Sequence, residues 1–98
     1  MDYIFILRHY YEDYYLIDFD INLHIDVLRA MLNVLQESQN YNGLFFITHE
    51  EDREKIDKIK KLGFYYDDTL LEYARSNGNK YVCYSRYRNL DKKLTKEF

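Results

Sequence analysis

The chain has 98 residues, with 14 Lys/Arg against 17 Asp/Glu and a formal net charge of −3 at pH 7. This length allows one domain, residues 1–98, with a core of modest size. No apolar run approaches the roughly 20 residues that cross a bilayer, and the start MDYIF lacks the basic region of a signal peptide, so we expect no membrane association. The single cysteine excludes an internal disulfide and fits a reducing cytoplasm.

The charges are unevenly distributed along the chain. Residues 1–72 hold 7 Lys/Arg and 15 Asp/Glu, whereas residues 73–98 hold 7 Lys/Arg and 2 Asp/Glu. Contacts to phosphate need basic side chains, so the acidic body disfavours direct nucleic-acid binding. An acidic surface suits a protein partner that is itself basic, for example one that binds nucleic acid. The alternative is that the basic end of the chain folds against the acidic body.

The N-terminal stretch predicts a β-hairpin. Residues 3–10 and 14–20 have the composition of strands, and Glu12 and Asp13 supply the polar break between them. Four tyrosines lie near the tip and have two interpretations. They form cross-strand packing pairs, which we favour for most of them, or they form an aromatic contact surface; the four are Tyr10, Tyr11, Tyr14 and Tyr15.

The next stretch predicts the main core helix, over residues 23–38. Asn22 is of the residue types preferred at a helix N-cap. Asp26, Arg29, Asn33 and Gln36 fall on one side at helical spacing, and a wide apolar face lies opposite them. The apolar positions are Leu23, Val27, Leu28, Met31, Leu32, Val34 and Leu35.

Residues 43–66 predict a buried strand, a helix and the start of another strand. The apolar run 44–47 is typical of a strand that is buried on both faces. Thr48 precedes Glu51 by three residues, the spacing of a capping box at the start of a helix. Gly63 suits a left-handed helix end. Between these signals the buried stripe of the helix is narrow and consists of Ile56, Ile59 and Leu62.

The acidic turn at Glu50, Glu51 and Asp52 also has two interpretations. Acidic residues complement the dipole at a helix N-terminus, and charge runs are usually solvated faces, so we favour this interpretation. The alternative is a binding role for the same residues.

The C-terminal third predicts a second hairpin. After an extended segment at 64–66, Asp67 and Asp68 break the pattern, and strands at 70–75 and 80–88 flank an Asn-Gly turn. Residues 89–98 are a frayed tail or a short helix. The element order is therefore ββαβαββ. It predicts an α+β protein with a mixed sheet, two helices packed on that sheet, and parallel strands before and after the long helix.

This succession of segments resembles the C-terminal two thirds of the GNAT acetyltransferase family, which binds acetyl-CoA. The resemblance covers residues 16–88 and is strongest at Leu62-Gly63-Phe64, where the family also ends a helix in Leu-Gly-Phe. The matching segments are LIDFDIN, LHIDVLRAMLNVLQES, LFFITHEE, DREKIDKIKKLGF and the predicted hairpin over 70–88.

The residues that carry the family's chemistry do not match. The family binds pyrophosphate with a glycine-containing loop at the start of the long helix, where backbone amides point at the anion, but this chain has no glycine before Gly43. The asparagine and tyrosine that the family carries in the following helix correspond to Asp52 and Ile59 here. The resemblance therefore implies a reduced GNAT-like protein without the cofactor site. Phosphate would also be repelled by Asp18, Asp20 and Asp26.

No other motif predicts a reaction centre. His9, His24 and His49 lack the spacing of metal ligands, and Cys83 fits a small core residue better than a nucleophile. Basic and aromatic residues interleave over residues 73–88, a pattern that can bind single-stranded nucleic acid. We favour a solvated strand face there.

The sequence therefore supports a non-enzymatic protein-binding module on a GNAT-like scaffold, without catalytic, cofactor or metal residues. In a narrower form, it is an acidic inhibitor from a phage or mobile element, anti-CRISPR-like, that acts on a host nucleic-acid-handling or defence protein. The alternative is a minimal acetyl-CoA-dependent N-acetyltransferase that holds the cofactor along parted strands near Phe46 and Ile47. The partner-binding residues predicted for the first hypothesis are Tyr10, Tyr11, Glu12, Asp13, Tyr14, Glu50, Glu51 and Asp52.

Overall fold

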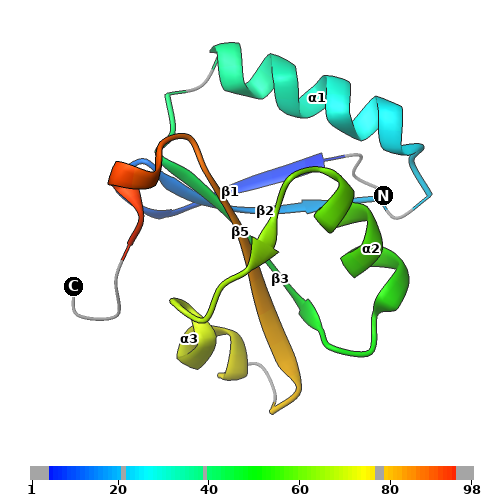
Figure 1. The fold of residues 1–98 in the computed structure, drawn as a ribbon, viewed down its shortest axis with the longest axis vertical. Helices are drawn as coiled ribbons and strands as arrows, with labels where there is room; N and C mark the ends of the chain where they lie inside the picture. The colour runs from blue at the N-terminus through cyan, green and yellow to red at the C-terminus, as the bar shows by residue number, and fades with distance from the viewer. Residues whose placement is uncertain (1–4, 21, 39, 77–78, 95–98) are drawn as a thin grey trace.

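A computed structural model describes residues 5–20, 22–38, 40–76 and 79–94 (Figure 1). These residues form an α+β fold with a mixed five-stranded sheet in the order β1-β2-β3-β5-β4. The α+β class predicted from the sequence is confirmed. In chain order the elements are β1 (Phe5–Tyr11), β2 (Tyr14–Phe19), α1 (Ile25–Ser38), β3 (Gly43–His49), α2 (Arg53–Lys61), β4 (Tyr65–Tyr66), α3 (Leu71–Arg75), β5 (Tyr81–Tyr87) and the 3-10 helix η1 (Leu90–Lys92).

The predicted N-terminal hairpin is confirmed. β1 and β2 are antiparallel, from Phe5 opposite Phe19 to Tyr11 opposite Tyr14, with an irregularity between His9 and Tyr11. Glu12 has a φ of 45°, the left-handed conformation that tight hairpin turns require. The amide of Asn42 donates to the carbonyl of Asp13 at 2.7 Å. This bond ties the hairpin tip to the chain just before β3.

β2 and β3 are parallel neighbours that separate part of the way along. Their register runs only from Tyr14 opposite Gly43 to Leu16 opposite Phe45. β3 meanwhile stays paired with β5 through His49 opposite Tyr81. β3 therefore follows β5 away from β2, and Figure 1 shows the two strands diverging from this short contact.

Side chains alternate between the two faces of the sheet along each strand. The two faces are covered by helices to different extents. α1 and α2 cover the first face over the larger core, whereas α3 and the C-terminal segment cover part of the second (Figure 1). The second core consists of Tyr14, Phe45, Leu70, Cys83 and Leu94. The first consists of Ile17, Phe19, Leu28, Leu32, Tyr41, Leu44, Phe46, Ile56, Ile59, Leu62, Phe64 and Tyr84.

The long helix is confirmed, but its buried face is narrower than predicted. Only Leu28 and Leu32 are fully buried in α1, while Val27 is 46% and Val34 63% exposed. Leu28 and Leu32 lie one turn apart on the side that faces the sheet, and Leu35 is partly buried against the same core. The predicted N-cap at Asn22 is wrong, since the helix begins three residues later, where His24 Nδ1 accepts from the amide of Asp26 at 3.1 Å.

The predicted capping box is also wrong. α2 begins only at Arg53, with Asp52 at the N-cap and no side-chain bond to the helix amides. The Thr48 hydroxyl instead donates to Asp52 Oδ2 at 3.3 Å. The end of the helix is as predicted: Gly63 has a φ of 91°, a left-handed position where glycine avoids the Cβ strain.

The second predicted hairpin is absent from the described residues. The segment 70–75 contains the short helix α3 instead of a strand, and Leu70 and Ala74, one turn apart, are buried beneath it. β5 pairs along its length with β3 on one side, and the short strand β4 pairs with its residues Tyr84 and Ser85 on the other. The predicted Asn77-Gly78 turn lies outside the described residues. Of the two predictions for the tail, the short helix is correct for Leu90–Lys92.

Among the residues that the structure describes, no helix has the length and apolar character needed to cross a membrane.

Candidate functional site

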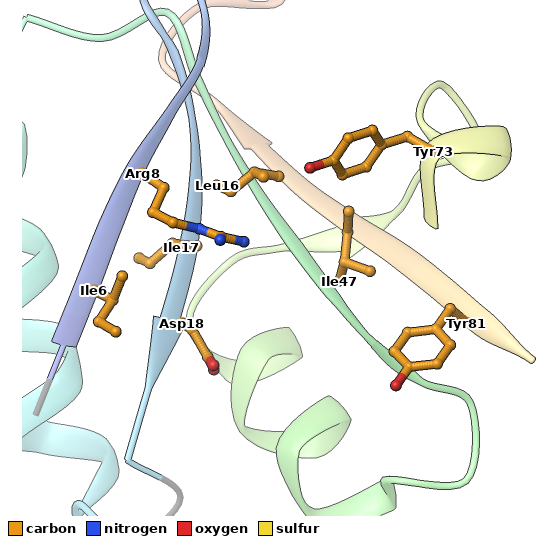
Figure 2. Close-up of a pocket in the computed structure, with 8 residues that line it drawn as sticks. All are labelled: Ile6, Arg8, Leu16, Ile17, Asp18, Ile47, Tyr73 and Tyr81. Atoms are coloured by element: carbon orange, nitrogen blue, oxygen red, sulfur yellow. The ribbon is translucent and has the colours of Figure 1, made fainter. Parts of the chain in front are cut away.

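The candidate site is a concavity on the second face of the sheet, at the point where β2 and β3 separate (Figure 2). Its volume is about 490 Å³, within the roughly 300–1,000 Å³ typical of ligand pockets. α3 lies over β5 on this face and reaches the Tyr10 end of β1 through Tyr73, which leaves the surface around Ile6, Arg8 and Asp18 open. The lining residues are Ile6, Arg8, Leu16, Ile17, Asp18, Ile47, Tyr73 and Tyr81.

The period-two alternation of the strands places these side chains together. In the antiparallel β1–β2 pair, Ile6 lies opposite Asp18 and Arg8 lies opposite Leu16, so all four share one face. Ile47 reaches the same face from β3, where its register partner is Cys83 of the second core. Strand divergence then opens a floor of half-buried aliphatic side chains between β2 and β3.

Arg8 supplies a positive charge at this floor. Its side chain is exposed and extends over the concavity in Figure 2. Within the described part of the chain, its guanidinium forms no hydrogen bond and no ion pair. The planar five-donor group is thus available to a ligand.

Asp18 has a different environment although it lies diagonally across from Arg8. Its Oδ1 is 3.5 Å from Lys55 Nζ of α2 and accepts from the amide of Phe19 at 2.8 Å. The carboxylate therefore already has a cation beside it. The charge balance of the concavity is positive on the Arg8 side.

Two tyrosines form the opposite wall. The ring of Tyr73 on α3 packs edge-on against Tyr10, with centroids 5.4 Å apart, and Tyr81 on β5 packs edge-on against His49 at 5.6 Å. These contacts fix both rings. Neither phenol hydroxyl forms a hydrogen bond with any residue that the structure describes.

A second polar cluster, around Asp67, anchors α3 and hence the Tyr73 wall. The Asp67 carboxylate is 5% exposed and accepts from the Thr69 amide at 2.9 Å and the Thr69 hydroxyl at 2.6 Å. The Ser85 hydroxyl donates to it at 2.7 Å and the Tyr87 hydroxyl at 2.9 Å. Burial by itself raises the pKa of Asp67, but the bonds from Thr69, Ser85 and Tyr87 outweigh it and lower the pKa below its ordinary value.

Cys83 is unsuited to nucleophilic chemistry. The residue is fully buried, and burial together with the negative charge of Asp67 raises the pKa of its thiol to about 12. The reactive thiolate is therefore scarce at neutral pH. No group of three or more metal-ligating side chains occurs among the described residues.

The partner-binding residues predicted from the sequence do not form one surface. Glu12 and Asp13 lie beside the start of β3, whereas Glu50 and Glu51 follow its end. Seven residues of extended strand at about 3.3 Å each place roughly 20 Å between the two groups. Only the group at Glu50 and Glu51 adjoins the concavity, because His49 is the register partner of the lining residue Tyr81.

The aromatic residues of the hairpin tip serve mainly in packing, as favoured from the sequence. Tyr14 is 6% exposed, Tyr10 is half-buried, and both rings lie 6.2 Å from that of Phe45. Tyr11 is 41% exposed and stacks on Tyr14. Asp52 is half-buried at the start of α2. Tyr11 and the exposed Glu12 are the tip residues best placed to touch another molecule.

The basic end of the chain is engaged with helix ends. Arg86 donates to the carbonyl of Leu62 at 3.1 Å, and Arg88 donates to the carbonyl of Tyr41 at 2.6 Å. Both arginines lie on the face opposite Tyr81 and Tyr87, because β5 alternates. The interleaved basic and aromatic residues of β5 are thus divided between two faces, which weakens the hypothesis of a single nucleic-acid-binding surface.

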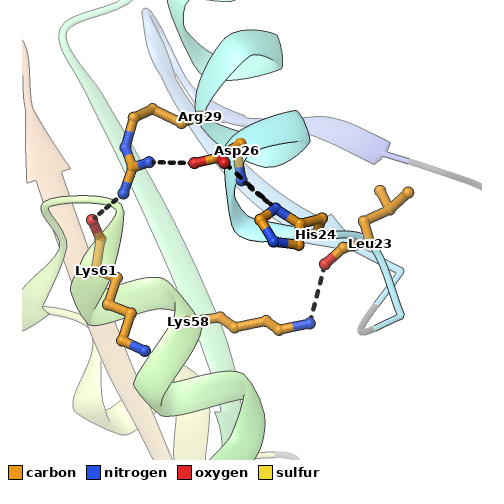
Figure 3. Close-up of polar contacts among 6 residues, drawn as sticks. All are labelled: Leu23, His24, Asp26, Arg29, Lys58 and Lys61. Atoms are coloured by element: carbon orange, nitrogen blue, oxygen red, sulfur yellow. Dashed lines mark hydrogen bonds and ion pairs between the residues drawn. The ribbon is translucent and has the colours of Figure 1, made fainter.

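The start of α1, where the family resemblance would place a phosphate-binding loop, is joined to α2 by the chain's own polar groups (Figure 3). Lys58 Nζ donates to the carbonyl of Leu23 at 2.9 Å. Arg29 is bonded to Asp26 at 3.0 Å and reaches the carbonyl of Lys61 at 3.5 Å. Two of the cations nearest this helix end therefore already have protein partners, and the Asp26 carboxylate lies beside them.

Reasoning from the sequence alone missed Arg8 and Asp67 as members of a site, and it considered Tyr73 and Tyr81 only in the disfavoured pattern for binding single-stranded nucleic acid. The alternation in β1 and β2 placed Arg8 and Asp18 on one face, and this was the available signal. Comparison with protein families, with curated proteins and with solved structures found no match for the chain. Inference about function therefore starts from the geometry of the concavity.

Proposed function

We propose that this protein is a non-enzymatic protein-binding module on a GNAT-like scaffold, and that it binds its partner through the concavity on the open face of the sheet. One observation carries the proposal. Half-buried aliphatic side chains lie there beside a cation and two phenol hydroxyls that no described residue engages. Concave apolar surfaces with a few convergent polar groups are typical of binding sites.

Several features support the GNAT-like part of the proposal. α1 connects two parallel strands, the second of these is buried, and α2 ends at Leu62 and Gly63 before Phe64. The chain departs from the pattern inferred from the sequence in its last part. There α3 replaces the first strand of the expected closing hairpin, and β5 pairs with the short strand β4.

In its narrower form, the proposal is a small acidic inhibitor from a phage or mobile element that acts on a basic host protein in the cytoplasm. The target is a nucleic-acid-handling or defence protein. The net charge of −3 and the exposed Glu50 beside the concavity support a basic partner, whereas the neighbouring Glu51 already lies 3.7 Å from Lys80 Nζ. The buried free thiol of Cys83 fits a reducing compartment.

The test is capture from bacterial lysates with matched variants. Tyr73 lines the concavity and Tyr65 lies on the edge strand β4, and both are 41% exposed. We expect Tyr73→Ala to reduce capture of a specific protein at least tenfold, because interface aromatics often contribute about 2 kcal/mol or more. We expect Tyr65→Ala to leave capture unchanged. No captured protein, or equal loss in both variants, would contradict the proposal.

A second candidate, the minimal acetyl-CoA-dependent N-acetyltransferase, is favoured by one observation. The separation of β2 and β3 after Leu16 and Phe45 leaves room beside Ile47, where this hypothesis places the cofactor, although Phe46 is buried in the first core. Thermal unfolding with and without millimolar acetyl-CoA distinguishes the two candidates. A ligand at 100 times its Kd stabilises by about 2.7 kcal/mol, a shift of several degrees for a domain of this size. An unchanged unfolding temperature would remove this candidate.

A further inference from the structure

We propose that the concavity around Arg8 recognises a carboxylate that is attached to an apolar group. The proposal specifies the ligand chemistry of the surface described above. It rests on the proposed function only for the idea that a protein supplies this carboxylate.

The concavity is positively charged on the side of Arg8. Arg8 lies opposite Leu16 in the register, with Asp18 two residues further along β2. Such diagonal neighbours are about 7–8 Å apart, within reach of a long side chain. Asp18 nevertheless contacts Lys55 at 3.5 Å, and Arg8 is bonded to no described residue. An incoming anion thus meets a cation whose charge no described neighbour neutralises.

The hydrogen-bond donors of Arg8 match the geometry of a carboxylate. A guanidinium presents two parallel N–H groups that match the two oxygens of a carboxylate. The unengaged hydroxyl of Tyr73 points toward the Arg8 side of the concavity in Figure 2 and offers a further donor, whereas the Tyr81 hydroxyl points away from it. One cation and one hydroxyl suit a singly charged carboxylate. A phosphate dianion would also approach the Asp18 carboxylate, which disfavours it.

Aliphatic side chains form the floor of the concavity. Leu16 and Ile47 are half-buried between the charged side of the concavity and its aromatic wall. An alkyl or aryl group on the ligand would bury the remaining apolar surface of these side chains, which favours binding. The combination selects a carboxylate that carries an apolar body over a small hydrophilic anion.

The carboxylate has two sources that the chemistry leaves equivalent. It is a free small molecule, or it is an acidic side chain flanked by apolar residues in a protein partner. Hydrocinnamate represents the first source, and a blocked Leu-Asp-Leu tripeptide represents the second. Hydrocinnamamide has the same apolar body without the charge, and inorganic phosphate has charge without the apolar body.

The experiment is a titration of the isotope-labelled protein followed by amide NMR shifts. We expect hydrocinnamate to shift residues of the concavity, including Leu16 and Ile47, and we expect Arg8→Gln to weaken binding roughly tenfold to a hundredfold, the range for a hydrogen bond to a charged group. Arg75→Gln is the matched control, since Arg75 is also exposed, bonds to no described residue and lies outside the lining. Arg8 is bonded to no described residue, so we expect its replacement to leave the fold intact.

Four outcomes would overturn the proposal. The first is that neither hydrocinnamate nor the tripeptide binds at millimolar concentration. The second and third are that hydrocinnamamide binds as tightly as hydrocinnamate, or that inorganic phosphate binds more tightly than hydrocinnamate. The fourth is that Arg8→Gln and Arg75→Gln reduce the affinity for hydrocinnamate equally. Tighter binding of the tripeptide than of hydrocinnamate would assign the carboxylate to a protein, and the reverse would assign it to a metabolite. Carboxylate binding without any captured protein would refute the proposed function and support the carboxylate site. Tyr73-dependent capture of a protein without carboxylate binding would support the proposed function and refute the carboxylate site.

Discussion

Asp67 provides the sharpest test of how the fold holds the wall of the candidate site. Replacement by alanine leaves the Ser85 hydroxyl, which is fully buried, and the half-buried Tyr87 hydroxyl without their acceptor. A buried polar group that loses its partner costs about 1–3 kcal/mol. With the lower value for Tyr87, and with the turn at Thr69 weakened, we expect Asp67→Ala to lower the free energy of unfolding by about 2–4 kcal/mol. For a domain of this size the unfolding temperature should fall by roughly 10–25 °C.

The assay is urea unfolding at neutral pH, followed by circular dichroism. Asp57→Ala is the matched control because Asp57 is exposed on α2, and we expect it to stay within about 0.5 kcal/mol of the unmodified protein. A double-mutant cycle with Ser85→Ala should give a coupling of about 1–2 kcal/mol. Equal stabilities for the two aspartate variants, or additive effects in the cycle, would refute the assignment of the hydroxyls to Asp67.

The same cluster predicts a dependence on pH. The pKa of Asp67 in the folded protein is lowered from 3.8, so the unfolded chain takes up its proton first as the pH falls. The stability that the carboxylate contributes is therefore complete above about pH 4 and is lost as the pH falls through the folded pKa. Asp67→Asn should lack this loss. Unfolding curves of the two proteins that run parallel below pH 4 would contradict the prediction.

Three further predictions concern single positions. Leu32→Ala should lower the free energy of unfolding by about 2–5 kcal/mol because Leu32 is 1% exposed. Val34→Ala on the same helix should change it by less than about 0.5 kcal/mol. Equal effects of the two substitutions in urea unfolding would show that the wide apolar face of α1 is buried. Gly63→Ala should cost about 1–2 kcal/mol because of the positive φ, and an unchanged unfolding midpoint would contradict it. Cys83 should resist a thiol-exchange reagent in the native protein and react only on unfolding, because it is fully buried with a raised pKa; rapid reaction without denaturant would disprove this.

The sequence by itself determined the parts of the fold that depend on local patterns. The composition of residues 3–10 and 14–20 predicted both strands of the first hairpin. The apolar run at 44–47 predicted the buried strand β3. Gly63 marked the end of α2 because a left-handed position favours glycine whatever lies around it.

Predictions failed where two structures are locally compatible with the same residues. Residues 70–75 were predicted as a strand because they precede an Asn-Gly turn signal, but Leu70 and Ala74 are spaced for one helical face, and most residues of this segment are of types that favour a helix. The capping-box spacing at Thr48 was present, yet the chain runs on to Arg53 before the helix begins. Local propensity is a weak term that tertiary contacts override.

The candidate site was decided by the tertiary structure alone. Arg8, Ile47, Tyr73 and Tyr81 come from four different elements, and no spacing along the chain relates them. They meet because β3 follows β5 away from β2, which opens the sheet, and because the Asp67 cluster holds α3 over the far side of the opening. Strand divergence depends on how many register pairs form between segments distant in sequence. That number is set by packing on both faces of the sheet, which no local pattern encodes.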